Sequence, residues 1–136
     1  MKILLAYDDS EPSQRALHTL GWLAVAQSEV VIVFVLMGMA LSAEGEPIEA
    51  DPEDVRQAEE ALTRALAVVE TLGLSSVRTE ILVGDPKFKI LQKASKENTD
   101  LIITGCRGHG FAKRLVFGSV SNVILHEAEC PVMVVK

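Results

Sequence analysis

The sequence predicts an α/β fold in which a five-stranded parallel sheet lies between two layers of helices. Short apolar runs of strand character alternate along the chain with amphipathic helical runs, a pattern typical of parallel sheets covered on both faces. The run Val77 to Val83 differs from the others, because its apolar residues alternate with Arg78 and Glu80. A half-polar strand belongs at a sheet edge, and a third strand at the edge gives the predicted strand order 3-2-1-4-5.

Length and composition indicate one domain that spans residues 1–136, with 49% hydrophobic residues to build its core. No apolar run approaches the ~18 residues of a membrane span, and the N-terminus lacks the pattern of a signal peptide. Cys106 and Cys130 are too few for a disulfide framework, so we expect a cytoplasmic protein. The net charge of −6 argues against nucleic acid as a partner.

The first strand is expected at Lys2 to Tyr7, where nearly every residue is apolar, as in a strand buried on both faces. Ser10 is placed to cap the helix that follows, which turns Leu17 and Leu20 toward the core. A second β-branched run, Glu29 to Leu36, predicts the second strand.

Residues Met37 to Asp51 show no clear period, and we expect them to form a mobile connection that is longer than a usual strand-to-helix loop. Asp51 is a predicted N-cap for the second helix, with Pro52 at its first position and Gly73 just beyond its end. The edge strand Val77 to Val83 follows.

Asp85 and Pro86 repeat this cap-and-proline start for a third helix, which buries Ile90. The fourth strand is expected at Leu101 to Thr104 and the fifth at Pro131 to Val135. Between these two strands lie a glycine-rich loop and a last helix.

The glycine-rich loop contains Gly105, Gly108 and Gly110 and ends at Gly118, directly before a helix that begins at Ser119. The N–H groups at a helix start are unpaired and attract anions, and glycines let the backbone come close to phosphate oxygens. In open parallel sheets, ligands bind where the strand order reverses, here between the first and fourth strands. The loop therefore predicts a nucleotide phosphate site, although glycines after a strand also form simple turns.

The spacing of the glycines favours a phosphate site over a simple turn. Two residues separate Gly105 from Gly108, nine separate Gly108 from Gly118, and Ser119 follows. This spacing resembles the G-x2-G-x9-G-[S/T] signature of the ATP-binding branch of the universal stress protein family. The segments KILLAYDDSEPSQRAL, VGDP and GSVSNVILHEAECPVMVVK are similar to other parts of that family, so the resemblance covers nearly the whole chain.

The resemblance implies a Rossmann-like fold of the adenine-nucleotide alpha-hydrolase type, with ATP as the ligand. Asp8 would lie beside the adenosine, and the backbone at Val35 would meet the adenine edge. The ribose and phosphates would contact Gly105, Gly108, Gly118, Ser119 and Ser121. Beyond what the resemblance implies, Val120 at the same helix start and the loop residues Arg107 and His109 are further candidates for contact with the phosphates. Arg107 and His109 have solvated loop positions as an equal alternative. The resemblance also implies a homodimer formed through the last strand, and the sequence leaves open whether Mg²⁺ accompanies the nucleotide.

Asp9 stands where the family often has a small residue. Asp8 is the better candidate for the ligand, because successive residues that leave a strand point in opposite directions. The Asp8-Asp9 pair also resembles that of a response-regulator receiver domain. That chemistry requires a phosphate-accepting aspartate after the third strand, where Asp85 has the pattern of a helix cap.

The favoured function is a nucleotide-dependent regulatory module in the stress response, because no Walker-B acid or catalytic lysine stands at a defined spacing. There are two alternatives. One is a slow ATPase that uses Arg107 and His109, and the other is a dimeric scaffold that uses no nucleotide. Lys113 and Arg114 either supply positive charge to the site or form a solvated face. The three histidines show no metal-ligand spacing, and Trp22 is expected in the core.

Overall fold

The computed structural model describes residues 1–23, 27–37, 50–106 and 118–136. Within these ranges, strands and helices alternate along the chain as β1 (Lys2–Ala6), α1 (Glu11–Leu23), β2 (Glu29–Leu36), α2 (Pro52–Thr71), β3 (Val77–Val83), α3 (Pro86–Lys96), β4 (Leu101–Gly105), α4 (Ser119–Glu127) and β5 (Val132–Val135). All pairings in the sheet are parallel, in the order β3-β2-β1-β4-β5, which confirms the predicted order.

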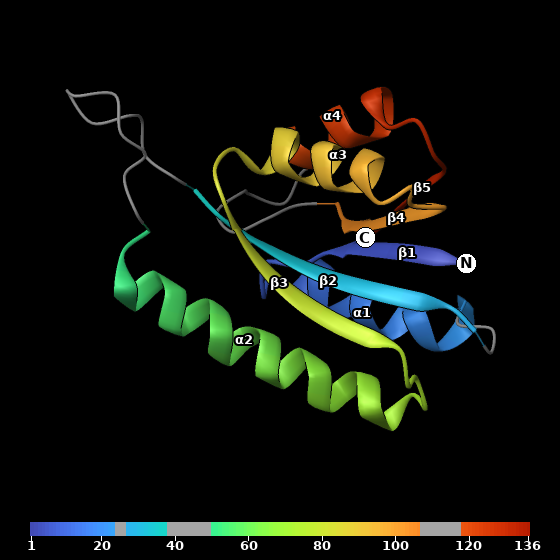
Figure 1. Cartoon of the computed structure of the whole chain (residues 1–136), viewed down its shortest axis with the longest axis horizontal. Helices are drawn as coiled ribbons and strands as arrows, with labels where there is room; N and C mark the ends of the chain where they lie inside the picture. Colours follow the sequence, from blue (N-terminus) through green and yellow to red (C-terminus); the bar gives the residue numbers. More distant parts are fainter. Residues whose placement is uncertain (24–26, 38–49, 107–117) are drawn as a thin grey trace.

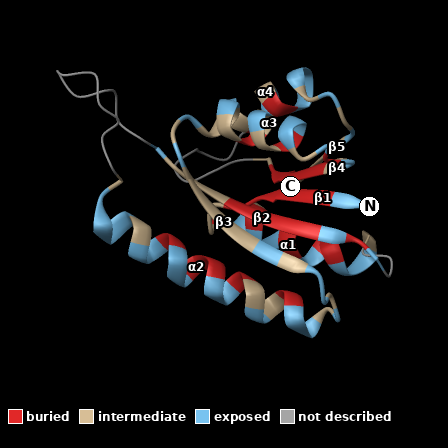
Figure 2. Ribbon diagram, viewed as in Figure 1, coloured by how far each residue is buried: buried red, intermediate tan, exposed pale blue. Residues whose placement is uncertain are grey.

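The sheet separates two layers of helices and two hydrophobic clusters. Figure 1 shows α1 and α2 on one face and α3 and α4 on the other. One cluster packs Leu5 and Ile103 against Leu17 of α1 and Leu62 of α2. The other cluster packs the opposite face of the central strands against α3 and α4. Figure 2 shows the central strands as the most continuously buried part of the chain, as their unbroken apolar runs predict.

The predicted helix caps are confirmed. The side chain of Asp51 accepts a hydrogen bond of 2.8 Å from the backbone N–H of Glu53 at the start of α2. The side chain of Asp85 accepts one of 3.0 Å from Lys87 at the start of α3. Gly73 follows α2 with a φ of 75°, the left-handed conformation expected of a glycine just past a helix end.

The prediction that Trp22 lies in the core is wrong, since 85% of the residue is exposed. Helix α1 buries Leu17 and Leu20, and Trp22 lies about 200° around the helix from Leu20, which turns it toward solvent. The expectation came from the type of residue, whereas its position on the helix decides its exposure.

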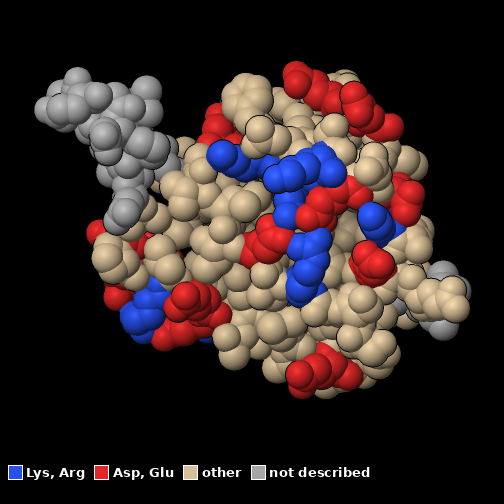
Figure 3. All heavy atoms as spheres, viewed as in Figure 1, with Lys and Arg blue, Asp and Glu red and all other residues tan. Residues whose placement is uncertain are grey.

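The edge strand β3 carries a network of charges that it shares with α3. Arg78 pairs with Glu80 and Glu97, and Lys93 lies 2.6 Å from both Glu80 and Glu97. The hydrogen bond from Arg78, supported by Lys93, lowers the pKa of Glu97 to about 2. Figure 3 shows basic and acidic side chains interleaved over this part of the surface. Charges on an edge strand oppose pairing with another strand, which fits the exposed position of β3.

The connection expected to be mobile falls largely on residues 38–49, which lie outside the described residues. In the part of the chain that the structure describes, no helix combines the length and apolar character needed to span a bilayer.

Candidate functional site

A cavity of about 390 Å³ opens at the carboxyl ends of the central strands β1, β2 and β4. At this place the chain leaves β1 for α1 on one face of the sheet and leaves β4 for α4 on the other (Figure 1). The diverging connections create the crevice where ligands bind in open parallel sheets.

The structure brings seven of the ten predicted site residues to the wall of this one cavity. They are Asp8, Val35, Gly105, Gly118, Ser119, Val120 and Ser121. The other three, Arg107, Gly108 and His109, lie outside the described residues, as do Lys113 and Arg114.

The side chain of Asp8 is oriented by the turn that follows β1. One of its oxygens, Oδ1, accepts hydrogen bonds from the backbone N–H of Ser10 at 3.0 Å and from the Ser10 hydroxyl at 2.5 Å. The backbone N–H of Asp8 donates to the Ser13 hydroxyl at 3.4 Å. These bonds form an Asx turn that holds the Asp8 carboxylate at the cavity wall.

Asp9 has a different environment and does not line the cavity. It adopts a φ of 64°, and its carboxylate accepts hydrogen bonds from the Tyr7 hydroxyl at 2.9 Å and from Arg64 of α2 at 2.8 Å. Burial by itself would raise the pKa of Asp9, but the bonds from Tyr7 and Arg64 hold it below its ordinary value. Burial and the adjacent Asp9 raise the pKa of Tyr7. Asp9 therefore ties α2 to the turn, while Asp8 faces the cavity.

Gly105 ends β4 under the first turn of α1. A Cβ atom at this position would lie 2.8 Å from the backbone nitrogen of Ser13 and 2.9 Å from the carbonyl carbon of Pro12. Such contacts are closer than packed atoms tolerate, so the close packing of α1 on β4 requires a glycine here. This packing role is independent of any ligand.

The described ends of the glycine-rich loop are joined by hydrogen bonds. The carbonyl oxygen of Cys106 accepts from the backbone N–H of Gly118 at 2.7 Å and from the Ser121 hydroxyl at 3.0 Å. The Ser121 hydroxyl also lies 3.1 Å from the carbonyl oxygen of Gly118. Ser121 is buried and uses its hydroxyl proton within the chain, so it fixes the start of α4 beside the end of β4.

The start of α4 lies at the cavity. Its N-cap is Gly118, and no side chain of the described residues makes a capping hydrogen bond there, unlike Asp51 at α2 and Asp85 at α3. The first N–H groups of a helix have no partner within the helix and carry its positive partial charge. Ser119 and Val120 place these groups on the cavity wall.

The opposite wall is apolar and includes residues that the sequence analysis missed. Phe34 and Met37 come from β2 and its end, whereas Pro86 and Ile90 come from α3. The sequence offered one signal for Pro86 and Ile90. A helix predicted to begin just after the third strand begins at the carboxyl ends of the parallel strands, which is the side of the sheet where the cavity opens. Together, the walls suit a ligand with an apolar, flat end and an anionic end.

A model of the universal stress protein family matches residues 1–136. The chain belongs to the universal stress protein family.

This universal stress protein is 35% identical over 136 residues to a universal stress protein of Thermus aquaticus, with 98% of the chain and 97% of the relative covered. It is 31% identical over 139 aligned residues to a universal stress protein of Methanocaldococcus jannaschii, with 99% and 81% covered. The structure of the universal stress protein from Archaeoglobus fulgidus in complex with dAMP has the same fold, with a TM-score of 0.77 at 24% identity and coverage of 100% and 98%.

Proposed function

We propose that this protein is a cytoplasmic regulator that binds an adenine nucleotide, ATP in particular, and changes its contacts with partners according to nucleotide occupancy under stress. The observation that carries the proposal is the meeting of Asp8 with Gly118 and Ser119 around one cavity. The two segments are far apart in the sequence, and each was predicted to contact a different part of the same ligand.

In the proposed complex, the adenine lies on the apolar wall beside Val35 and Ile90, and Asp8 faces the sugar end. The phosphates lie at the start of α4, where the backbone N–H groups of Ser119 and Val120 attract an anion. From the motif alone, Arg107, Gly108 and His109 are proposed to complete the phosphate site. A universal stress protein of the same fold has been solved with dAMP, which makes adenine nucleotides the first ligands to test.

A regulatory role is favoured over hydrolysis by the charge of the site. Asp8 is the one carboxylate among the described residues of the cavity, and it follows β1, whereas the proposed phosphate site is at the start of α4. Activation of water for attack on a γ-phosphate requires a base or orienting group close to the phosphates.

We further propose a homodimer formed through β5, because this apolar strand lies at an edge of the sheet and is only half buried. Sedimentation velocity tests this proposal. A single species with the mass of one chain across micromolar concentrations would contradict it.

Isothermal titration with ATP, AMP, dAMP and GTP tests the nucleotide proposal, each with and without Mg²⁺. We expect ATP to bind with a dissociation constant of micromolar order, about 8 kcal/mol. Gly118→Val places a side chain against the proposed phosphates, and the φ of −58° at Gly118 is one that valine adopts without strain. We expect this variant to unfold at the same urea concentration as the parent and to bind ATP at least tenfold more weakly. If the parent and the variant bind ATP equally well, the loop is a simple turn and does not contact the phosphates.

A further inference from the structure

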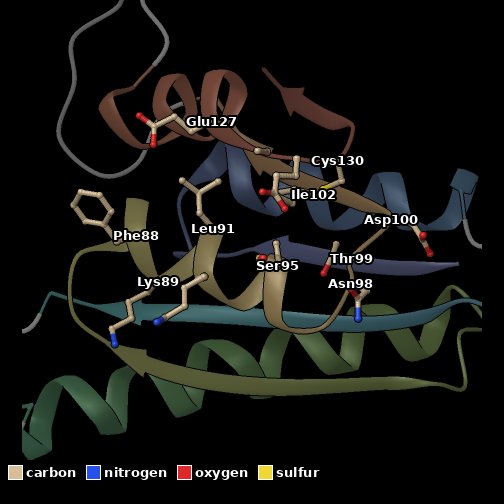
Figure 4. A pocket seen from close by; sticks show the side chains of 14 residues that line it. Phe88, Lys89, Leu91, Ser95, Asn98, Thr99, Asp100, Ile102, Glu127 and Cys130 are labelled. Carbon is tan, nitrogen blue, oxygen red and sulfur yellow. The ribbon is translucent and has the colours of Figure 1, made fainter.

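A second hollow, of about 790 Å³, lies between α3 and α4 and extends to the loops that precede β4 and β5 (Figure 4). It shares no lining residue with the candidate nucleotide cavity among the residues described. Its volume falls within the range of roughly 300–1,000 Å³ that is typical of ligand sites. We call this hollow the α3–α4 groove.

The floor of the α3–α4 groove is apolar. Leu91 of α3, Ile102 of β4 and Cys130 converge on it, and Figure 4 shows Phe88 at one end of the groove, below Glu127. Phe88 is 64% exposed, so most of its ring is open to solvent. An exposed aromatic residue beside an apolar floor is a common feature of protein-binding surfaces.

The rim of the groove is acidic. The exposed carboxylates of Asp100, Glu127 and Glu129 line it, and in the described part of the chain none of the three forms an ion pair. The Asp100 carboxylate accepts a hydrogen bond of 2.7 Å from the backbone N–H of Lys2. Lys89 is the one basic residue among the described lining residues, but its side chain packs against Gly84 at the end of β3 and points away from Glu127 (Figure 4).

The position of Glu127 strengthens this negative field. Glu127 is the last residue of α4, where the helix dipole already places negative partial charge. A cation in the groove would offset the repulsion between the Glu127 carboxylate and the negative end of the α4 dipole, and it would give Glu127 and Glu129 an opposite charge to pair with. The whole chain carries a net charge of −6, so a basic partner fits this groove better than a second copy of the chain.

We propose that the α3–α4 groove docks a basic, apolar peptide segment of a partner protein. An aliphatic or aromatic side chain of the partner lies on the floor against Phe88 and Leu91. Its lysine or arginine side chains pair with Glu127, Glu129 and Asp100. Polar residues of α3 such as Gln92 and Ser95 line the remaining wall and provide hydrogen-bond partners for the peptide backbone.

The same two helices also line the candidate nucleotide cavity. Pro86 and Ile90 of α3 and Ser119 of α4 face that cavity, whereas Leu91 and Glu127 face the groove. A ligand that changes the spacing of α3 and α4 at one site changes it at the other. This coupling rests on the proposed nucleotide function, whereas peptide docking itself does not. By thermodynamic linkage, the nucleotide and the peptide must change each other's affinity by the same factor.

The probe for the test is a fluorescein-labelled octapeptide of alternating arginine and leucine, whose binding to the full chain is measured by fluorescence anisotropy. Octapeptides that alternate glutamate with leucine, or arginine with serine, serve as matched probes. We expect saturable binding of the arginine–leucine peptide and at least tenfold weaker binding of the other two. No saturable binding of the arginine–leucine peptide, or equal binding of all three, would overturn the proposal.

Two protein variants separate the groove from the overall charge. Glu127→Lys with Glu129→Lys reverses the rim, and Glu59→Lys with Glu70→Lys makes the same change in net charge on exposed positions of α2. We expect the rim variant to lose at least tenfold in peptide affinity and the α2 variant to stay within twofold. Equal losses in the two variants would overturn the proposal, and so would a self-association of the chain that competes with the peptide.

A third variant, Phe88→Ala, tests the apolar part of the groove, and we expect it to weaken binding about fivefold. Parallel ATP titrations keep the two proposals apart. Peptide binding in a protein that binds no nucleotide would refute the proposed function alone, whereas nucleotide binding without peptide binding would refute the groove alone.

Discussion

Replacing Gly105 with alanine tests the packing of α1 against β4 beside the candidate site. The added Cβ would lie 2.8 Å from the Ser13 nitrogen and 2.9 Å from Pro12 atoms, and two of these three close contacts are to backbone. Neither backbone atom can turn aside, so the first turn of α1 has to move. Overpacking of this kind costs about 1–3 kcal/mol.

A matched substitution, Gly21→Ala, makes the same chemical change within α1. Its Cβ would lie 3.1 Å from the nearest atom, a methyl group of Leu72, which can turn aside. Alanine also favours a helix over glycine by about 1 kcal/mol. We therefore expect Gly21→Ala to be neutral or slightly stabilising.

Urea unfolding followed by far-UV circular dichroism measures both effects. For a slope near 2 kcal/mol/M, Gly105→Ala should lower the midpoint by roughly 0.5–1.5 M without changing the slope. ATP affinity should fall with it, because Ser13 and Asp8 line the cavity and move with α1. A Gly105→Ala protein as stable as the parent, with Gly21→Ala destabilised instead, would refute the packing argument.

Three further substitutions test individual interactions. Ser121→Ala removes the hydroxyl that joins Cys106 to the start of α4. We expect the free energy of unfolding in urea to fall by about 1 kcal/mol and ATP to bind more weakly. If neither value changes, the hydrogen bond is dispensable. Arg64→Ala should raise the pKa of Asp9 toward its ordinary value in an NMR titration. ATP affinity should stay within twofold of the parent, because Asp9 does not line the cavity. A large loss of affinity would mean that Asp9 contacts the ligand. Glu97→Gln tests the charge network of β3 and α3. Because the folded-state pKa of Glu97 is lowered to about 2, its contribution to stability is complete above the unfolded-state pKa and is lost as the pH falls through the folded-state value. After allowance for partial exposure, the variant should be about 1 kcal/mol less stable than the parent at neutral pH. In urea titrations this difference should shrink steadily as the pH falls from the unfolded-state pKa toward 2. A pH-independent difference would exclude ionisation as its cause.

The order of the strands and the ends of the helices were predictable because local chemistry determines them. The alternation of Arg78 and Glu80 with apolar residues marked β3 as an edge, and Asp51 and Asp85 cap their helices as their positions indicated. The prediction for Trp22 was wrong because it considered the hydrophobicity of the side chain and not the direction in which that position on the helix points.

The candidate site was only partly predictable, because several of its properties arise from packing between distant segments. The structural need for glycine at Gly105 depends on how closely α1 approaches β4. Ile90 and Pro86 reach the cavity only through the crossing of α3 over the sheet. The use of the Ser121 hydroxyl within the chain depends on the position of Cys106, fifteen residues earlier.

The central claim is that an adenine nucleotide occupies the cavity between the end of β1 and the start of α4. Amide chemical-shift mapping of the isotope-labelled protein during titration with ATP tests it most directly. The largest changes are predicted at Asp8, Val35 and the segment from Gly118 to Ser121. Shifts that gather instead around Asp100 and Glu127, or no shifts at millimolar ATP, would contradict the claim.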